Sequence, residues 1–323
     1  MAERPREKLW VVRPGDGATV ADIVRHAGEP PDAIDEGRVF LGKKRVTRAD
    51  QAVRAGDAVR IGQGRAPDDG MVPAVHLLFV EGGLAACVKP AGLPTVPDRA
   101  GAARSLVAVV ATMLRKRPDE LRVTSRLDRD VSGVVVFALD EAAEQRLKQA
   151  RAEGKYARRY VALASTSADA ASGGTWTAPI GRATDPHLRR ARGPEAKEAT
   201  THWRELARTR PVSTPGARGG PTTIALLAVD PVTGRTHQIR VHASDAGMPL
   251  VGDRDYGGPT RLVLGDGSIV STTRIGLHAA RVVVPGERGP IEAIAPIPSE
   301  LSALWTRLGG DAGAWEQAIA AVV

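Results

Sequence analysis

Two carboxylates and two guanidinium groups crowd into the segment 125–133, which has the sequence SRLDRDVSG. The acidic residues are Asp128 and Asp130, and arginines stand at positions 126 and 129. A carboxylate beside arginines stays ionised, so either aspartate could act as a nucleophile or as a base. Taken alone, the segment favours a plainer interpretation, an ion-pair cluster that closes a turn before the apolar strand that follows.

A second dense polar segment, 231–242, has the sequence PVTGRTHQIRVH. So many polar groups ahead of apolar residues are costly to bury without partners. If Thr236 caps a helix that runs to Gly247, His237 and Arg240 lie on adjacent rows of one helix face. Strict alternation of the same residues instead predicts a strand, and periodicity alone leaves both structures open.

Metal and cofactor sites find little support in the sequence. The spacing of His237 and His242 fits no usual helical pair of metal ligands, and no acidic third ligand is nearby. The single cysteine, Cys87, excludes a cysteine-based zinc site and an intrachain disulfide. The chain also lacks a GxxxxGKS or GxxxxGKT phosphate-binding loop, so we expect neither a metal nor a cofactor.

Positive charge is concentrated in one region. The chain has 45 Lys and Arg against 37 Asp and Glu, and residues 146–210 hold 14 of the former against 6 of the latter. This region therefore accounts for the whole net charge of +8. Such a potential fits a polyanionic partner such as nucleic acid, and a solvated basic face has the same composition.

No segment of the sequence predicts a membrane partner. No stretch approaches the ~20 apolar residues of a membrane span, and the N-terminal MAERPREKLW lacks the apolar core of a signal peptide. Together with the single cysteine, these features favour a cytoplasmic protein. We expect it to be a monomer.

Composition divides the chain into two domains. Residues 15–65 contain a helical pattern at 20–27 and short apolar runs, and the Gly-, Pro- and Asp-rich segment 62–73 predicts a linker. We therefore expect domains at 1–70 and 71–323. The first resembles a degenerate copy of the RNA-binding module named after bacterial ribosomal protein S-four, and a ubiquitin-like or other small α+β fold fits equally well.

The larger domain mixes strands and helices in an irregular order, which predicts an α+β fold rather than a doubly wound sheet. Apolar runs and turn residues predict strands at 77–80, 84–88, 134–139, 160–164 and 222–228, and helices at 105–115 and 140–154. The glycine-bounded segment 252–258 predicts a turn that positions the element before it.

The polar segments and three further elements resemble those of RluA-type pseudouridine synthases. That family carries a KPAGL element, an HRLDxxTSG segment, a lysine-any-tyrosine element, GRTHQIRVH followed by GxPxxGDxxYGG, and an LHA element. The corresponding residues here are 89–93, 125–133, 158–162, 234–258 and 277–279. The resemblance spans residues 72–305, and five elements in the right order very rarely occur by chance.

This resemblance implies a pseudouridine synthase fold with a central mixed, largely antiparallel sheet and a catalytic cleft. It also implies a reaction, the isomerisation of specific uridines in structured RNA, with ribosomal RNA favoured over transfer RNA. In the family, an aspartate attacks the sugar or the base so that the N-glycosidic bond breaks. The uracil then turns and rejoins through a ring carbon, and no cofactor is needed.

The family's catalytic roles fall on three residues of this chain. Asp128 matches the essential aspartate, and Asp130 does not. Arg240 resembles the arginine that pairs with that carboxylate and holds it aimed. Tyr160 resembles the tyrosine that packs on the target base and helps with proton transfer.

Substrate-binding roles are implied for further residues. Arg126 matches the arginine that helps to extrude the nucleotide and fills the space it leaves. Leu277 would supply an apolar wall for the base, and Arg158 replaces the usual lysine with a different geometry. The basic region would flank the cleft and hold phosphates, with contacts from Arg189, Arg190 and Arg192. His237 and Gln238 would orient Arg240 and the surrounding backbone.

Two positions depart from the family pattern, Ser125 for the usual histidine and Val131 for the usual threonine. Neither is the nucleophile, so we expect altered support or altered RNA contact rather than loss of activity. Two other hypotheses stay open from the sequence. One is a non-catalytic RNA-binding protein on the same scaffold, and the other is a hydrolase that uses the two neighbouring aspartates.

Overall fold

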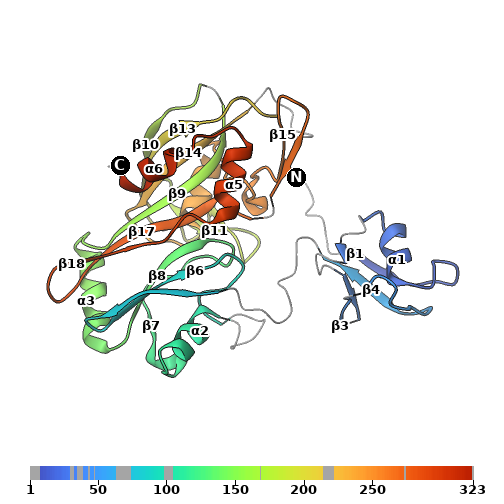
Figure 1. The fold of residues 1–323 in the computed structure, drawn as a ribbon, viewed down its shortest axis with the longest axis horizontal. Coiled ribbons are helices and arrows are strands. Elements are labelled where there is room, and N and C mark those ends of the chain that lie inside the picture. The colour runs from blue at the N-terminus through green and yellow to red at the C-terminus, as the bar shows by residue number, and fades with distance from the viewer. Residues whose placement is uncertain are drawn as a thin grey trace. The chain divides into compact units, whose positions relative to one another are not determined.

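The computed structural model divides the chain into two compact units, Met1–Met71 and Val72–Val323 (Figure 1). It describes residues 8–29, 33–34, 39–42, 44–46, 48–62, 74–97, 105–167, 169–213, 222–272 and 274–321. Apart from residue 62, the segment expected as a linker lies outside the described residues. No helix in these ranges is long and apolar enough to cross a membrane.

The N-terminal unit is a small antiparallel sheet with one helix. Its elements are β1 (Lys8–Val11), α1 (Val20–His26), β2 (Val39–Leu41), β3 (Lys44–Arg45) and β4 (Ala58–Ile61), and the strand order is β1-β4-β2-β3. Helix α1 begins at Thr19, whose side chain and that of Asp22 cap each other's backbone N–H groups. Apolar residues of α1 and of the strands form a separate core. That this unit is an RNA-binding module stays a prediction.

The C-terminal unit is built around one large sheet. Its strands are β5 (His76–Glu81), β6 (Leu84–Lys89), β7 (Arg122–Val123), β8 (Ser132–Ala138), β9 (Ala157–Thr166), β10 (Gly173–Trp176), β11 (Ile180–Arg182), β12 (Arg189–Ala191), β13 (Thr201–Arg208), β14 (Thr223–Pro231), β15 (Arg261–Val263), β16 (Ile269–Ser271), β17 (Leu277–Pro285) and β18 (Pro290–Ile294). Its helices are α2 (Leu106–Met113), α3 (Glu141–Ala152), α4 (Gln238–Asp245), α5 (Ser299–Arg307) and α6 (Ala314–Ala320), with short 3-10 helices η2 (Pro118–Glu120) and η3 (Arg254–Tyr256).

Ten strands form this sheet, in the order β10-β13-β14-β9-β17-β8-β6-β5, with β18 paired to β17 and β7 paired to β8. The contact between β17 and β8 is parallel, and the other described pairs are antiparallel. The prediction of an α+β fold with a mixed, largely antiparallel sheet is therefore confirmed.

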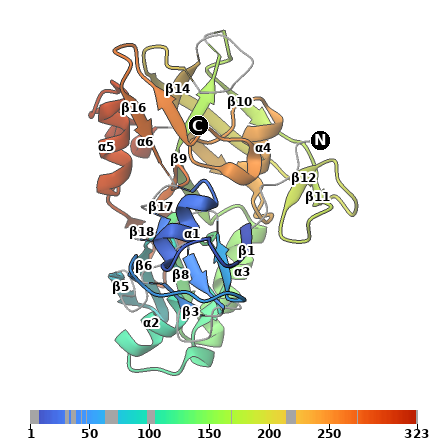
Figure 2. The same ribbon diagram turned by 90° about the vertical axis from the view of Figure 1, so that its right-hand side faces the viewer.

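Helices cover both faces of the sheet, as the alternation along β9 shows. Tyr160 and Ala162 belong to the core that contains residues of α2 and α4, whereas Val161 and Leu163 belong to the core formed with α5 and α6. Figure 2 shows α4 and α5 on opposite sides of β9. Because side chains of a strand point alternately to either face, every residue in the middle of β9 is buried.

The parallel contact between β8 and β17 requires Gly133. This residue pairs with Ala279, and its φ of +124° suits glycine. A Cβ atom at this position would lie 2.2 Å from the carbonyl oxygen of Ala279, so no side chain fits. The two backbones therefore approach closely where the segment around Asp128 leads into β8 and where β17 begins.

His278 is buried inside this junction. Its Nδ1 atom lies 2.6 Å from the hydroxyl oxygen of Ser132, and its side chain has no exposed surface. Burial, reinforced by the nearby Arg274 guanidinium, lowers the pKa of His278 to about 3.

We predict that His278 makes the protein less stable in acid. The unfolded chain binds a proton at this position near pH 6.5, whereas native His278 does so only near pH 3. The free energy of unfolding should therefore fall by ~1.4 kcal/mol per pH unit as the pH decreases between these values. His278→Gln should remove that part of the slope in urea unfolding, and His76→Gln, at an exposed site, should not. Equal slopes in the two variants would contradict the prediction.

Candidate active site

A cleft of about 1580 Å³ opens in the C-terminal unit, where the segment before β8, the start of β9, the segment before α4 and the start of β17 meet. Six of the predicted site residues line it, namely Asp128, Tyr160, Arg240, Arg126, Leu277 and Arg158. Arg189, Arg190 and Arg192 do not belong to this lining. The structure thus brings the three predicted catalytic residues together and places Arg189 and Arg190 of β12, and Arg192 directly after it, outside the cleft lining.

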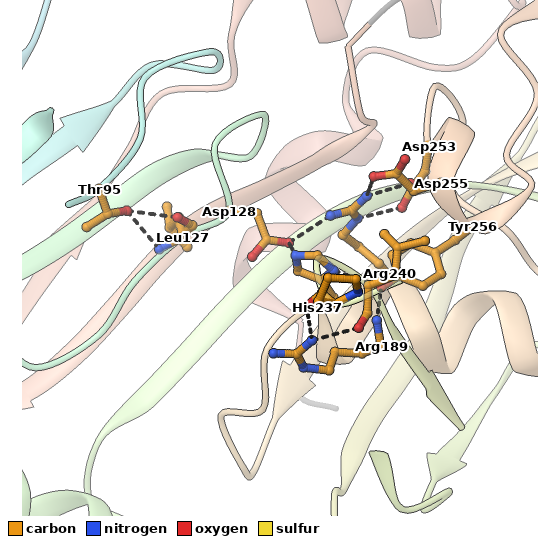
Figure 3. Close-up of polar contacts among 11 residues, drawn as sticks. Thr95, Leu127, Asp128, Arg189, His237, Arg240, Asp253, Asp255 and Tyr256 are labelled. Carbon is orange, nitrogen blue, oxygen red and sulfur yellow. Dashed lines mark hydrogen bonds and ion pairs between the residues drawn. The ribbon is translucent and has the colours of Figure 1, made fainter. Parts of the chain in front are cut away.

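The backbone on both sides of Asp128 is held by buried side chains. The Thr95 hydroxyl donates to the carbonyl of Leu127 at 2.8 Å and accepts from its N–H at 3.1 Å (Figure 3). The Lys89 ammonium donates to the carbonyl of Arg129 at 2.8 Å and to two further carbonyls. Burial lowers the pKa of Lys89 to about 7. The residues before and after Asp128 are therefore fixed to the strand that ends at Lys89 and to the segment after it.

The Asp128 carboxylate presents its two oxygens differently. Oδ2 accepts a hydrogen bond from Nη1 of Arg240 at 3.2 Å, and Oδ1 has no donor among the residues that the structure describes. The side chain is 25% exposed and lines the cleft, whereas Asp130 is exposed and lies outside the lining. One oxygen is thus held by Arg240, while the other has no hydrogen-bond donor in the described part of the chain.

Arg240 is a buried cation with three carboxylate partners (Figure 3). Asp253 accepts from its Nε at 2.7 Å and from its Nη2 at 2.8 Å, and Asp255 accepts from Nη2 at 3.1 Å. The Tyr256 ring lies 4.7 Å from the guanidinium carbon. Burial alone would lower the pKa of Arg240, but the hydrogen bonds and charges of Asp253 and Asp128 hold it above its usual value. Arg240 is therefore a fixed charge, unable to exchange protons.

Within the segment 231–242, Pro231 ends β14 and residues 238–242 begin a helix rather than a strand, so α4 carries Arg240 into the cleft. The expectation that Thr236 caps this helix is wrong, because the N-cap residue is His237, with φ of +57° and no side-chain cap. Gln238 holds the entry to the helix through hydrogen bonds to Thr233, to the Arg235 N–H and to β13. Gln238 thus orients the backbone, whereas the His237 ring faces Asp128 with Nε2 3.9 Å from Oδ2.

Tyr160 and Leu277 form an apolar wall of the cleft. They lie on the adjacent strands β9 and β17, where Tyr160 pairs with Ala279 and Leu277 with Ala162, and both side chains belong to one core. The Tyr160 hydroxyl has no hydrogen-bond partner among the described residues, and burial raises its pKa. The wall is therefore apolar, and its one polar group is the Tyr160 hydroxyl.

The predicted substrate-binding arginines differ in what they already contact. Arg126 is exposed, and its guanidinium has no protein partner within the described ranges. Arg158 donates to the carbonyls of Pro231 and Thr233 at 2.9 and 2.8 Å, so it holds the segment before α4. Arg192 pairs with Asp245 at 3.0 Å. Only Arg126 of these three is fully available to RNA.

The sequence did not predict several residues that shape the site. Asp253, Asp255 and Tyr256 lie in the segment 252–258, which was expected only to form a turn, although it belongs to the motifs that carry the resemblance. Thr95 follows the KPAGL element, and nothing in its sequence context marks it. No group of three His, Cys, Asp or Glu side chains that could hold a metal occurs in the described parts of the chain.

A sequence profile of the RNA pseudouridylate synthase family matches residues 83–245, a range that contains Asp128, Tyr160 and Arg240. An uncharacterized RNA pseudouridine synthase of Bacillus subtilis strain 168 is 31% identical over 259 residues, which cover 78% of this chain and 79% of the relative. The chain belongs to the RNA pseudouridylate synthase family. The predicted RluA-type membership is confirmed, and this pseudouridine synthase is an isomerase that acts on RNA.

Further relatives and solved structures agree with this membership. Ribosomal large subunit pseudouridine synthase D of Xanthomonas campestris is 32% identical over 258 residues, which cover 76% of this pseudouridine synthase and 72% of the relative. The human RNA pseudouridylate synthase domain containing 1 superposes with a TM-score of 0.55 at 23% identity, covering 74% of this chain and 90% of the human one. The fold is therefore that of pseudouridylate synthase domains.

We predict that Thr95→Val slows this pseudouridine synthase more than it weakens RNA binding. Valine has nearly the same shape but leaves the N–H and carbonyl of Leu127 without their partner, so the Asp128 backbone loosens. A loss of ~1–2 kcal/mol in transition-state stabilisation, about tenfold in kcat, is expected. Thr112→Val, at an exposed position of α2, is the matched control, because its hydroxyl only bonds back to Ala108. Equal rates for both variants in single-turnover assays would refute a positioning role.

Proposed function

We propose that this chain converts specific uridines of structured RNA into pseudouridine, with Asp128 as nucleophile and without a cofactor. The observation that carries the proposal is the asymmetry of the Asp128 carboxylate at the cleft wall, in which Oδ2 is bound to Arg240 and Oδ1 has no donor among the described residues. A nucleophile needs one aimed and unoccupied oxygen on a rigid support. Ribosomal RNA is the favoured substrate, since relatives are named for the large ribosomal subunit.

The reaction exchanges one bond of the nucleoside for another without changing its composition. Asp128 attacks the sugar or the base, the bond from C1′ to N1 breaks, and the uracil turns. C1′ then bonds to C5, and the bond that Asp128 formed is broken again, which restores the free carboxylate. The proton that leaves C5 is replaced by one gained at N1. The uracil ring must turn against the wall of Tyr160 and Leu277. An apolar wall suits this movement because it forms no hydrogen bonds to the face of the ring.

Tyr160 is suited to donate a hydrogen bond to the base. Burial raises the pKa of its hydroxyl, which therefore remains protonated at neutral pH. To take the proton from C5, Tyr160 must first hand on its own proton. Its free hydroxyl at the cleft wall supports a role in that exchange.

The charges around the cleft favour a polyanion. Arginines that line it are Arg126, Arg129, Arg151, Arg158, Arg159, Arg235, Arg240 and Arg281, against the acidic residues Asp128 and Asp230. Such a surface attracts phosphates, and its affinity for RNA should fall as the salt concentration rises. The unpartnered guanidinium of Arg126 is available to fill the gap that a flipped-out nucleotide leaves. Contacts of Arg189, Arg190 and Arg192 with phosphates would extend the RNA beyond the cleft.

Asp128→Asn is expected to abolish turnover while folding and RNA affinity stay nearly unchanged, because an amide has a similar shape but is a poor nucleophile. Asp130→Asn is the matched control, since Asp130 lies outside the cleft lining. The measurement maps pseudouridines in ribosomal and transfer RNA from cells that lack the gene and carry either variant or the wild type. Pseudouridine formed by Asp128→Asn, or free uracil released by the wild type, would overturn the proposal.

We also propose that residues 1–70 add RNA contacts remote from the target base. Their separate core, and the location of every cleft residue in the second unit, support this division. Deleting them should leave turnover on a minimal stem-loop within about threefold of the full chain, whereas turnover on full-length RNA should fall tenfold or more through lost effective concentration. Equal losses on both substrates would show that this unit supports the active site itself.

A further inference from the structure

His237 lines the cleft next to Asp128 but has no part in the mechanism above. Its φ of +57° lies in the left-handed region, which costs free energy for a residue with a side chain. Such strain persists where the surroundings require a particular geometry, and it often occurs at functional sites. Here the strained backbone directs the imidazole toward Asp128 rather than toward a helix-capping contact.

One hydrogen-bond chain orients this imidazole (Figure 3). The Tyr256 hydroxyl accepts from the backbone N–H of Arg189 at 3.0 Å and lies 2.7 Å from Nδ1 of His237. The hydroxyl has one proton, and among the described residues Nδ1 is the acceptor within reach of it. A bond in which Tyr256 donates to Nδ1 satisfies this proton, and it places the ring proton of His237 on Nε2.

Both groups are neutral near pH 7. Burial lowers the pKa of His237, against the opposing charge of Asp128, and Arg240 lowers it further. Asp253 and Asp255 also act on His237, in the direction that raises its pKa. Burial raises the pKa of Tyr256 to about 12. The pair is thus a phenol and an uncharged imidazole, as the hydrogen-bond chain requires.

Among the residues that the structure describes, the Nε2–H group has no acceptor of its own. It lies 3.9 Å from Oδ2 of Asp128, which is beyond hydrogen-bond range, and Oδ2 already accepts from Arg240. A substrate atom that meets Asp128 would lie within reach of this donor. The neutral Nε2–H is a directed donor at the position where the nucleotide reacts.

We propose that His237 is a catalytic residue whose Nε2–H donates a hydrogen bond to a hydroxyl or carbonyl oxygen of the target nucleoside beside Asp128. Tyr256 is the positioning residue that fixes the required tautomer. This inference rests on the function proposed above. The alternative is a packing role only, because the His237 and Tyr256 rings also meet edge to face with centroids 5.7 Å apart.

Single-turnover rates at saturating RNA separate these roles. His237→Leu should lower the rate ~100-fold with little change in RNA affinity, because a donor to the reacting group is lost. His237→Gln, whose amide can place an N–H near the position of Nε2, should recover at least tenfold of that loss. A wild-type rate for His237→Leu, or no recovery by glutamine, would overturn the proposal.

A double-mutant cycle tests the link to Tyr256. Tyr256→Phe should slow the wild type about tenfold, because the tautomer is no longer fixed. In the His237→Gln background it should have almost no effect, since an amide has no tautomer to fix. Additive losses would show that the hydroxyl acts through Arg189 or Arg240 instead, and they would overturn its proposed role.

Nitrogen NMR of the folded full chain reports the tautomer without any turnover. Wild type should show the proton on Nε2 of His237, and Tyr256→Phe should show a mixture, whereas a proton on Nδ1 in the wild type would overturn the inference. Failure of the wild type to form pseudouridine would instead refute the proposed function. An RNA with 2′-deoxyuridine at the target distinguishes the acceptors, because the His237→Leu loss should vanish there if the 2′-hydroxyl is the partner.

Discussion

The ion pair between Arg240 and its carboxylates is the interaction on which the site depends. A buried guanidinium is costly unless its donors are satisfied, and Asp253, with 1% of its side chain exposed, satisfies two of them. With Arg240 locked in this way, its remaining Nη1 can only point at Asp128. The position of the Asp128 carboxylate is therefore set from α4 and the turn before η3. Thr95 and Lys89 hold the same segment from the opposite side.

The three carboxylates that contact Arg240 differ in how deeply they are buried. Asp253 is enclosed and accepts from two nitrogens, so both of its oxygens are engaged. Asp128 and Asp255 keep solvent contact, with 25% and 54% of their side chains exposed. Only Asp128 combines one held oxygen with a place in the cleft lining. The Arg240 guanidinium thus binds the enclosed Asp253 carboxylate on one side and hydrogen-bonds to Oδ2 of Asp128 on the other. Its fixed position therefore fixes the direction of the Asp128 carboxylate.

Local sequence patterns predicted the helices and strands, whereas the arrangement of residues in the cleft depends on contacts between residues far apart in the sequence. The helix predicted at 140–154 begins with Asp140 as the cap of α3, because a cap depends on neighbours three residues away, and the hairpin of β5 and β6 follows from its glycine turn. The segment 125–133 could not identify the partner of Asp128, which lies 112 residues away in the sequence. Thr95 acts through Leu127, 32 residues away, and no local pattern reveals such a contact. The grouping of Asp128, Tyr160 and Arg240 was predicted from the ordered family motifs and not from local sequence patterns.

Ser125 stands where the family usually has histidine, and the backbone around it is held by contacts of other residues. Its hydroxyl lies 3.3 Å from that of Tyr156, whose ring is covered by the Arg151 guanidinium at 4.4 Å. Arg151 also donates to the carbonyl of Thr124. The backbone is thus tied at residues 124, 127 and 129, on both sides of Asp128. Because the segment is anchored independently of the side chain at 125, replacing the family's usual histidine changes one wall of the cleft without moving Asp128.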